Sequence, residues 1–317
     1  ESNKKVDDEN DSSTDEDATN WQDSADYDIG DHVPFLLKAT LASNVADYDY
    51  YKVVFHDTLS AGLTYDSNAV VKINGNIVEN GFRITYADGN LTLSCDDVKA
   101  LGAGNSSVIT VEYTATLNEN AVLGATGNPN TVYLEYSNNP NWKPEGTTEP
   151  TGKTPTDKVI VFTYKTIVNK VDEKNQPLVG AGFTLYKYKF ESKSWEAIGD
   201  EVAGEKITTF EWVGLDDGNY KLVETTTPPG YNTMRDLEFT ITANHEATSD
   251  NPLLISLSGD ALTGDVNAGT LTGDIENQKG TTLPETGGIG RTIFYVLGAV
   301  LVIGAGVVLV SKKRMED

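Results

Sequence analysis

Short segments in which apolar and polar residues alternate, rich in Val, Ile, Thr and Tyr, recur through most of this chain between turn residues. This period of two places successive side chains on opposite faces of a β-strand, whereas the three-to-four residue spacing of an amphipathic helix is nearly absent. Asn74-Gly75 and Asp88-Gly89 are typical of tight hairpin turns between strands. The pattern therefore predicts an all-β body.

A concentration of Pro, Gly and Thr from Asn138 to Thr156 separates two sets of such segments and is typical of a loop or linker. A length of 317 residues suits two domains with short flanking segments. We therefore expect two immunoglobulin-like β-sandwiches in tandem, over residues 1–157 and 158–281. The expected strands are His32–Leu41, Tyr50–His56, Ala69–Ile73, Phe82–Tyr86, Leu91–Ser94, Ser107–Leu117, Thr131–Tyr136, Val159–Val171, Phe183–Phe190, Ser194–Ile198, Ile207–Trp212, Tyr220–Glu224, Leu237–Thr242 and Leu253–Ser256.

Charge and cysteine usage narrow the functional classes. The formal charge of −24 argues against a nucleic acid partner and against adsorption to an anionic surface. The single Cys95 cannot form an internal disulfide, so something else must make these domains durable.

Asp7–Asp17 holds seven carboxylates and no cation. It lacks the central Gly and terminal Glu of an EF-hand, so we expect a solvated loop, with a calcium site as the alternative and no cofactor.

The last 35 residues combine three elements in a fixed order. They are Leu283-Pro284-Glu285-Thr286-Gly287, an uncharged apolar run from Ile293 to Val310, and the basic residues Lys312, Lys313 and Arg314. About 18 apolar residues are the minimum for a helix that crosses a hydrocarbon core of roughly 30 Å, and basic residues behind it hold that end in the cytoplasm. We expect a transmembrane helix at 292–310, a cytoplasmic tail at 311–317 and a chain body outside the cell.

This tail resembles the cell-wall sorting signal of Gram-positive surface proteins, the LPxTG substrate motif of sortase transpeptidases. The resemblance implies that a sortase cysteine cuts between Thr286 and Gly287 of the motif at 283–287 and passes the threonine carbonyl to an amine. The helix is then a transient membrane tether, and an ordinary C-terminal anchor is the alternative. Because an exported protein needs a signal peptide and the chain begins at Glu1 without one, we expect it to be a fragment.

Residues 220–231, YKLVETTTPPGY, match all seven fixed positions of the pattern Y-x-L-x-E-T-x-x-P-x-G-Y. This segment resembles the E-box of collagen-adhesin B-type (Cna-B) domains, and Asn169–Glu173, Pro177–Phe183 and Ile275–Gly280 resemble the first strand, its turn and the last strand of that family. In the family, a lysine of the first strand and an asparagine of the last become joined by an isopeptide bond, with the E-box glutamate as catalyst. The resemblance implies that Lys170, Asn277 and Glu224 fill these roles.

The chemistry of these residue types agrees with that role. An ammonium group cannot attack an amide, but burial lowers the pKa of a lysine and raises that of a carboxyl group. A free amine can then attack the Asn277 carboxamide, while a protonated Glu224 polarises it and moves protons as ammonia leaves. The reaction is a single intramolecular event without turnover. A buried ion pair of Glu224 with a lysine is the plainer alternative.

Strand alternation tests this assignment. Glu224 shares parity with Tyr220 and Leu222, and Asn277 with Ile275, so each lies on the apolar face of its strand. Lys170 shares parity with Val168, but Ile167 and Val171 share the other, so alternation alone does not place the lysine. The nearest competitors in the sequence are Lys165 and Asn267. Asn267 lies in a near copy of the Asn277 segment, because Leu262–Asp265 recurs as Leu271–Asp274, a repeat for which a hairpin suffices.

The first half of the chain carries softer motifs. Tyr27–Asp31, Phe55–Leu63 and Asn128–Asn138 together resemble the middle domain of Gram-positive backbone pilins. That domain often carries its own isopeptide bond, formed by Lys, Asp and Asn, and the best matches here are Lys4, Asp57 and Asn130. Parity supports each choice, with Lys5 as a close competitor of Lys4. His56 beside Asp57 does not indicate a catalytic triad, because adjacent residues of a strand point to opposite faces and no G-x-S-x-G elbow occurs.

Together, the resemblances imply a structural subunit of a covalent pilus shaft, not an enzyme, located in the cell wall of a Gram-positive bacterium. The expected partners are sortases, neighbouring pilin subunits and peptidoglycan; host surface ligands are candidates and nucleic acid is not. The family's acceptor lysine lies in a W-x-x-x-V-x-V-Y-P-K stretch, which this chain does not contain. The alternative is a monomeric LPxTG-anchored adhesin that uses the Cna-B-type domain as a stalk.

Overall fold

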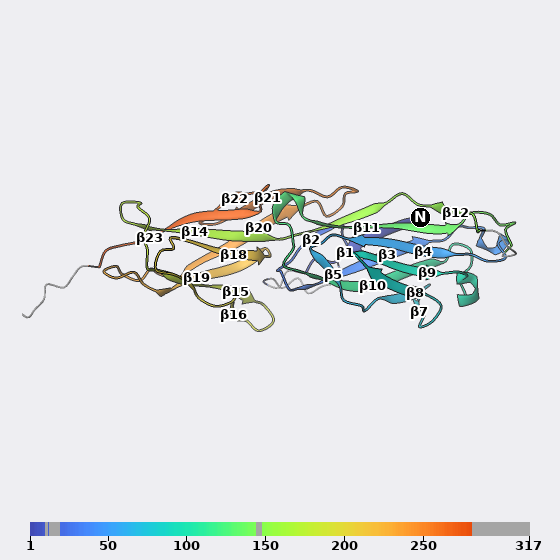
Figure 1. Ribbon diagram of the computed structural model, residues 1–317, viewed down its shortest axis with the longest axis horizontal. Coiled ribbons are helices and arrows are strands. Elements are labelled where there is room, and N and C mark those ends of the chain that lie inside the picture. The colour runs from blue at the N-terminus through green and yellow to red at the C-terminus, as the bar shows by residue number, and fades with distance from the viewer. Residues whose placement is uncertain (10–11, 13–19, 144–147, 281–317) are drawn as a thin grey trace, which may run out of the picture.

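The computed structural model describes residues 1–9, 12, 20–143 and 148–280. They form two β-sandwiches that lie end to end along the long axis of the molecule, with the N-terminal one on the right in Figure 1. The only helical elements within these residues are three short 3-10 turns at Val45–Asp47, Val98–Leu101 and Gly124–Thr126. The prediction of an all-β body is confirmed.

The first sandwich packs a six-stranded sheet against a seven-stranded one. The first sheet has the order β1 (Ser2–Val6), β3 (His32–Thr40), β10 (Val108–Leu117), β6 (Val70–Ile73) and β7 (Asn76–Ile77), with β5 (Leu63–Tyr65) also on β10. The facing sheet has the order β2 (Ser24–Asp26), β13 (Asp157–Phe162), β11 (Asn128–Ser137), β4 (Val53–Leu59), β9 (Asn90–Cys95) and β8 (Arg83–Ala87), with β12 (Thr151–Lys153) on β11. Strict alternation in β10 buries every second side chain, which is how two facing sheets form one core.

The second sandwich is smaller. One sheet has the order β18 (Thr209–Leu215), β14 (Tyr164–Asp172), β23 (Thr270–Asn277) and β22 (Thr263–Asp265). The other has the order β16 (Ser194–Ala197), β15 (Gly182–Lys189), β19 (Gly218–Thr226), β20 (Leu237–His245) and β21 (Leu254–Gly259), with β17 (Val202–Ala203) on β15. The first and last strands, β14 and β23, are parallel neighbours, with Lys170 opposite Ile275. The two ends of this domain are therefore adjacent in one sheet.

Two details differ from the sequence-based expectation. The single expected strand Val159–Val171 is two strands separated by Thr163: β13 pairs with β11 and β2 of the first sandwich, and β14 opens the second. The passage between domains thus lies at Thr163, a few residues beyond the expected boundary. The Pro- and Gly-rich stretch from Asn138 to Thr156 contains β12, which extends the first sandwich. The repeated Leu-Thr-Gly-Asp segments form the expected hairpin, since β22 pairs with β23.

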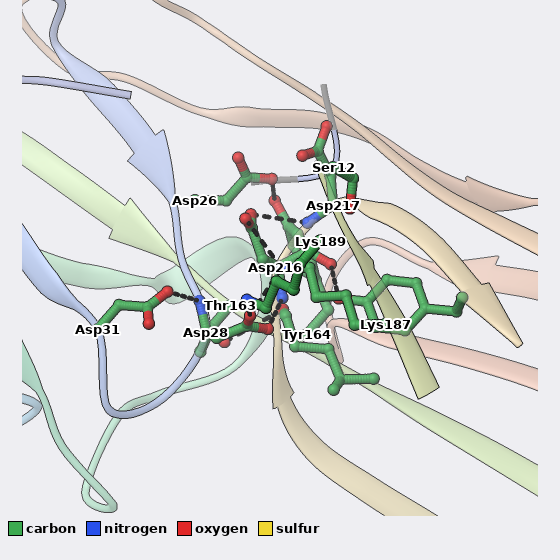
Figure 2. A network of polar contacts seen from close by, with 12 residues as sticks. Ser12, Asp26, Asp28, Asp31, Thr163, Tyr164, Lys187, Lys189, Asp216 and Asp217 are labelled. Atoms are coloured by element: carbon green, nitrogen blue, oxygen red, sulfur yellow. Dashed lines mark hydrogen bonds and ion pairs between the residues drawn. The ribbon is translucent and has the colours of Figure 1, made fainter. Parts of the chain in front are cut away.

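Polar contacts join the two sandwiches. Main-chain hydrogen bonds link Asp23 to Ala247 and Ile29 to Gly214 across the junction. Figure 2 shows the charged network beside them, in which Lys187 of β15 lies between Asp28 of the first domain and Asp216 of the second. We call Asp28, Lys187 and Asp216 the junction triad. Its charges, of which those of Lys187 and Asp216 are buried, tie the orientation of one sandwich to that of the other.

The expected sorting motif at 283–287, the apolar run at 292–310 and the tail at 311–317 lie outside the described residues. Within residues 1–9, 12, 20–143 and 148–280, no helix has both the length and the apolar character needed to cross a bilayer.

Two candidate lysine–asparagine crosslink sites

Lys170, Glu224 and Asn277 meet inside the second sandwich. Lys170 Nζ donates hydrogen bonds to Asn277 Oδ1 at 2.6 Å and to the main-chain oxygen of Ile275 at 2.9 Å. Asn277 Nδ2 donates to Glu224 Oε1 at 2.7 Å, and Lys170 Nζ lies 3.9 Å from the same carboxylate oxygen. The exposed fractions of Lys170, Glu224 and Asn277 are 0%, 4% and 1%. The amine, the carboxamide and the carboxyl group are therefore in mutual contact and away from bulk water.

The strands explain how the three side chains converge. Thr166, Val168 and Lys170 alternate inward along β14, so the lysine faces the core. Asn277 ends β23, the parallel neighbour of β14, while Glu224 comes from β19 in the facing sheet. The other carboxylate oxygen of Glu224, Oε2, accepts a hydrogen bond from the Met234 amide at 2.9 Å, which fixes the carboxyl group. Lysine and asparagine thus share a sheet, and the acid reaches them across the core.

The environment of Lys170 favours its reactive form. Burial lowers the pKa of this lysine to about 8, although the charges of Glu224 and Glu276 oppose the shift. A larger fraction of the amine is then uncharged at neutral pH than in an exposed lysine, and only the uncharged amine is a nucleophile. The carboxyl group beside both reactants can polarise the carboxamide and transfer protons. The arrangement can therefore form an amide between Lys170 and Asn277 with release of ammonia.

Lys4, Asp57 and Asn130 are brought together in the first sandwich, with Tyr113 among them. Lys4 Nζ donates hydrogen bonds to Asp57 Oδ1 at 2.5 Å and to the Tyr113 hydroxyl at 2.9 Å. The Tyr113 hydroxyl donates to Asp57 Oδ2 and accepts from Asn130 Nδ2 at 2.8 Å. Lys4 and Asn130 are 0% exposed and Asp57 is 1% exposed. The same three functional groups as in the second domain thus occupy a second buried site.

In this domain the two reactants come from different sheets. Lys4 lies on β1 and Tyr113 on β10 of one sheet, whereas Asp57 on β4 and Asn130 on β11 belong to the facing sheet. A bond between Lys4 and Asn130 would therefore join the two layers of the sandwich. The first-domain site would link sheet to sheet, whereas the second-domain site would link the first and last strands.

Burial shifts the pKa values of the first-domain groups in the directions that the reaction needs. It lowers the pKa of Lys4 to about 8 against the opposing charge of Asp57, and it raises the pKa of the Asp57 carboxyl group above its ordinary value. Within the residues that the structure describes, Asn130 Oδ1 is buried without a hydrogen-bond partner. A buried carbonyl oxygen without a donor is costly in a finished structure and leaves the carboxamide open to polarisation by an acid.

The competing residues occupy other surroundings. Lys5 points away from the core, is 29% exposed and pairs with Asp23. Lys165 pairs with Glu211 at 3.4 Å. Asn267 is exposed in the turn before β23, where its amide donates to Asp265. Within the described residues, none of these three lies at a place where an amine, a carboxamide and a buried carboxyl group meet.

The junction triad shows that burial alone does not make a reactive lysine. Lys187 is 1% exposed, and its Nζ lies 2.6 Å from Asp28 Oδ2 and 3.4 Å from Asp216 Oδ2 (Figure 2). Burial disfavours its charge, but the neighbouring carboxylates of Asp216 and Asp28 outweigh this and raise the pKa of Lys187 above its ordinary value. Lys187 is therefore held as a cation, which suits an ion pair and not nucleophilic attack.

Two groups at the junction could offer three ligands to a metal ion: Asp8 with Asp26 and His245, and Asp26 with Asp216 and Asp217. Asp8 is one of the residues of the acidic stretch for which a calcium site was the alternative. These groups already pair with protein atoms, since His245 lies 3.6 Å from both Asp8 and Asp26 and Tyr164 donates to Asp26. Ion pairs and hydrogen bonds at the junction therefore already engage Asp8, Asp26 and His245.

Sequence reasoning did not find Tyr113 or the junction triad. Tyr113 has the inward parity of β10, but a tyrosine at such a position is an ordinary core residue until its hydroxyl partners are known. The triad joins residues 28, 187 and 216, which no local pattern connects.

Models of known families match three parts of the chain. Residues 29–140 match the Gram-positive pilin backbone subunit 2, Cna-B-like domain, residues 164–252 match a prealbumin-like fold domain, and residues 275–317 match the LPXTG cell wall anchor motif. Among curated proteins, the trypsin-resistant surface T6 protein of Streptococcus pyogenes serotype M6 is 25% identical over 364 residues. That match covers 90% of this chain and 65% of the relative's length.

Solved structures share the fold. The T6 backbone pilin of serotype M6 Streptococcus pyogenes gives a TM-score of 0.60 at 23% identity, covering 88% of this chain and 70% of that one. A 35 kDa C-terminal fragment of a major pilin of Streptococcus agalactiae gives 0.59 at 22% identity, covering 87% and 98%. The pilus backbone protein of Streptococcus pneumoniae gives 0.56 at 15% identity, covering 88% and 100%.

Proposed function

We propose that this chain, a homologue of the T6 backbone pilin that carries a pilin backbone domain and an LPXTG cell wall anchor motif, is a structural subunit of a covalently polymerised pilus shaft. In this proposal it is a sortase substrate and not an enzyme. Its only chemistry is the formation of two internal isopeptide bonds, between Lys170 and Asn277 and between Lys4 and Asn130. The observation that carries the proposal is that each sandwich buries a lysine, an asparagine and a carboxylic acid in one contact network.

The second-domain reaction follows from the contacts. The uncharged Nζ of Lys170 attacks Cγ of Asn277, whose Nδ2 already contacts Glu224 Oε1. The attacking nitrogen, Nζ, must lose a proton, and the departing nitrogen, Nδ2, must gain one. Glu224 lies near both nitrogens, so it can accept the first proton and then donate a proton to the second. The Lys170 N–H bond and the Asn277 Cγ–Nδ2 bond break, the Nζ–Cγ bond forms, and ammonia departs.

Such bonds suit a fibre under tension. Lys170 and Asn277 lie 107 residues apart in the chain but on adjacent strands. Tension that enters the domain along β14 would cross to β23 through the Nζ–Cγ bond, so the strands between them need not unfold. The Lys4–Asn130 bond would likewise join the two sheets of the first domain. Two domains without any disulfide thereby become resistant to pulling.

The joining of subunits would use the C-terminal motif. A pilus-specific sortase would transfer the carbonyl of Thr286 to a lysine of the next subunit, and a housekeeping sortase would attach the finished fibre to peptidoglycan. The match of residues 275–317 to the cell wall anchor motif supports this role for Leu283–Gly287.

The experiment that tests the proposal is electrophoresis of cell-wall extracts from cells that express the chain with its natural upstream sequence. A ladder of species that resist SDS and depend on a sortase is expected from a shaft subunit. A Thr286→Ala variant should collapse the ladder. One wall-released band of monomer size in the wild type would instead favour the monomeric adhesin, and the shaft proposal would fail.

A further inference from the structure

Tyr113 occupies the centre of the first-domain site. It rises from β10, is 3% exposed, and stacks on Phe35 with ring centroids 5.4 Å apart. Its hydroxyl contacts all three groups of the site: it accepts hydrogen bonds from Lys4 Nζ at 2.9 Å and Asn130 Nδ2 at 2.8 Å, and donates one to Asp57 Oδ2. A phenol has one proton to donate and two lone pairs to accept with, so this arrangement uses its full capacity.

The second-domain site has no such intermediary in the part of the chain that the structure describes. There the carboxyl group of Glu224 contacts the leaving nitrogen of Asn277 directly, at 2.7 Å. The first-domain acid is Asp57, which is one methylene shorter. Among the described residues, Asp57 makes no hydrogen bond to Asn130, and the Tyr113 hydroxyl fills the place between them. Asp57 and the Tyr113 hydroxyl together span the distance to the carboxamide that Glu224 spans alone.

We propose that Tyr113 is a catalytic proton relay in the first-domain crosslink, passing a proton from Asp57 to the leaving nitrogen of Asn130. The inference rests on the crosslink proposed above. Lys4 Nζ attacks Asn130 Cγ, and Asp57 Oδ1 takes a proton from the attacking nitrogen. In the tetrahedral intermediate that results, Asn130 Nδ2 is an amine that can accept a proton. The Asp57 carboxyl group turns about its Cβ–Cγ bond and gives its new proton to the Tyr113 oxygen, while the phenol proton turns from Asp57 toward Asn130 and moves to Nδ2. The Cγ–Nδ2 bond breaks, ammonia leaves, and both Asp57 and Tyr113 end in their starting forms.

The electrostatics suit a relay that stays neutral. Burial and the adjacent Asp57 raise the pKa of Tyr113 well above its ordinary value, so the group is a phenol and not a phenolate before the reaction. A neutral hydroxyl can accept one proton while it gives another, without a net charge appearing in the core.

The test follows crosslink formation over time in the full chain. The chain is kept denatured from its synthesis onward, so that no crosslink forms beforehand. It is then refolded, quenched at intervals and digested. Mass spectrometry quantifies the linked peptides of Lys4–Asn130 and Lys170–Asn277. General acid–base groups contribute about a hundredfold or more to rate, so Tyr113→Phe should slow the first-domain bond by about that factor. The second-domain bond of the same molecule should form at its usual rate, which reports that the second domain has folded.

Tyr65→Phe is the matched control, because Tyr65 packs edge-on against Tyr113, and its hydroxyl accepts from the Ala69 amide outside the site. This variant should keep the wild-type rate. Fluorotyrosine at position 113 keeps the ring and the hydroxyl while lowering the pKa of the phenol. A relay predicts a changed rate and a shifted pH profile, whereas a phenol that only fills space predicts neither.

The outcomes separate the relay from the crosslink itself. A wild-type rate in Tyr113→Phe, or no change with fluorotyrosine, overturns the role of Tyr113 and leaves the crosslink standing. If wild-type chains never link Lys4 to Asn130, the first-domain bond is absent and the relay falls with it. If Tyr113→Phe disturbs folding, the fluorotyrosine result decides.

Discussion

Lys170 and Asn277 are separated by 107 residues in the chain, yet Lys170 Nζ and Asn277 Oδ1 are 2.6 Å apart between two parallel neighbouring strands. Parallel pairing puts the first and last strands of the domain side by side, pointing the same way. A covalent bond between Lys170 and Asn277 would join the first strand of this domain directly to its last strand.

The first prediction concerns the acid of this site. Glu224→Ala removes the only carboxyl group in contact with both Lys170 and Asn277 among the described residues, so the second-domain bond should not form. Mass spectrometry of the full chain should show one ammonia lost instead of two, with the first-domain bond retained. Glu211→Ala, which removes the partner of Lys165, is the control and should lose two. Loss of two ammonia molecules from Glu224→Ala would refute this chemistry.

The second prediction concerns stability. Glu224→Gln keeps the size and hydrogen-bonding capacity of the side chain but cannot shuttle a proton, so the domain should fold without its crosslink. By analogy with a disulfide that closes a loop of this length, the free energy of unfolding should fall by about 4 to 5 kcal/mol. Denaturant unfolding followed at Trp212, whose ring lies in the second core, measures the difference. Equal midpoints for Glu224→Gln and wild type would show that no crosslink contributes.

Much of the fold could be predicted from alternation, because each sandwich buries one face of every strand. The boundary between domains could not, since β13 and β14 form one apolar run in the sequence and only their partners distinguish them. The face of Lys170 was ambiguous for a physical reason. Val171 is buried on the opposite face of β14 by its bridge to Pro177, which breaks the alternation at the strand end.

The residues of the candidate sites also divide into those that the sequence could indicate and those that it could not. Lys4, Asp57, Asn130 and the E-box triad carry parity and motif signals, so sequence reasoning could nominate them. Tyr113 carries only the signal of a core residue, because its role depends on three partners from β1, β4 and β11. The junction triad depends on how two domains meet, which neither domain's own pattern encodes.

The third prediction concerns pH. The pKa of both Lys4 and Lys170 is lowered to about 8, so below that pH each lysine is mostly a charged, unreactive ammonium. The rate of crosslinking after refolding should therefore rise about tenfold per pH unit up to pH about 8. It should level off above that pH, where the amines are already mostly uncharged. Quenched refolding from pH 5 to 9, followed by peptide mapping, measures the profile. A rate independent of pH below 8 would contradict an amine nucleophile.

The fourth prediction concerns the junction triad. Lys187→Met keeps most of the apolar length of the side chain but leaves Asp28 and Asp216 without their shared cation. Removing one partner of a buried ion pair costs about 3 to 5 kcal/mol, and the cost should appear as looser attachment of the two sandwiches. Hydrogen exchange should accelerate at Ile29 and Asp216, whose amides bond across the junction. Both internal crosslinks should still form, since neither site contacts Lys187.

The control for this variant is Lys165→Met, which removes a lysine whose partner, Glu211, is half exposed. It should leave exchange at the junction unchanged.

The pH dependence of the stability that Lys187 contributes adds a second check. Because the pKa of Lys187 is raised in the folded chain, its contribution is complete at neutral pH and is lost only at alkaline pH, above the ordinary lysine value. Exchange at Ile29 that matches wild type in Lys187→Met would show that main-chain hydrogen bonds alone hold the domains together.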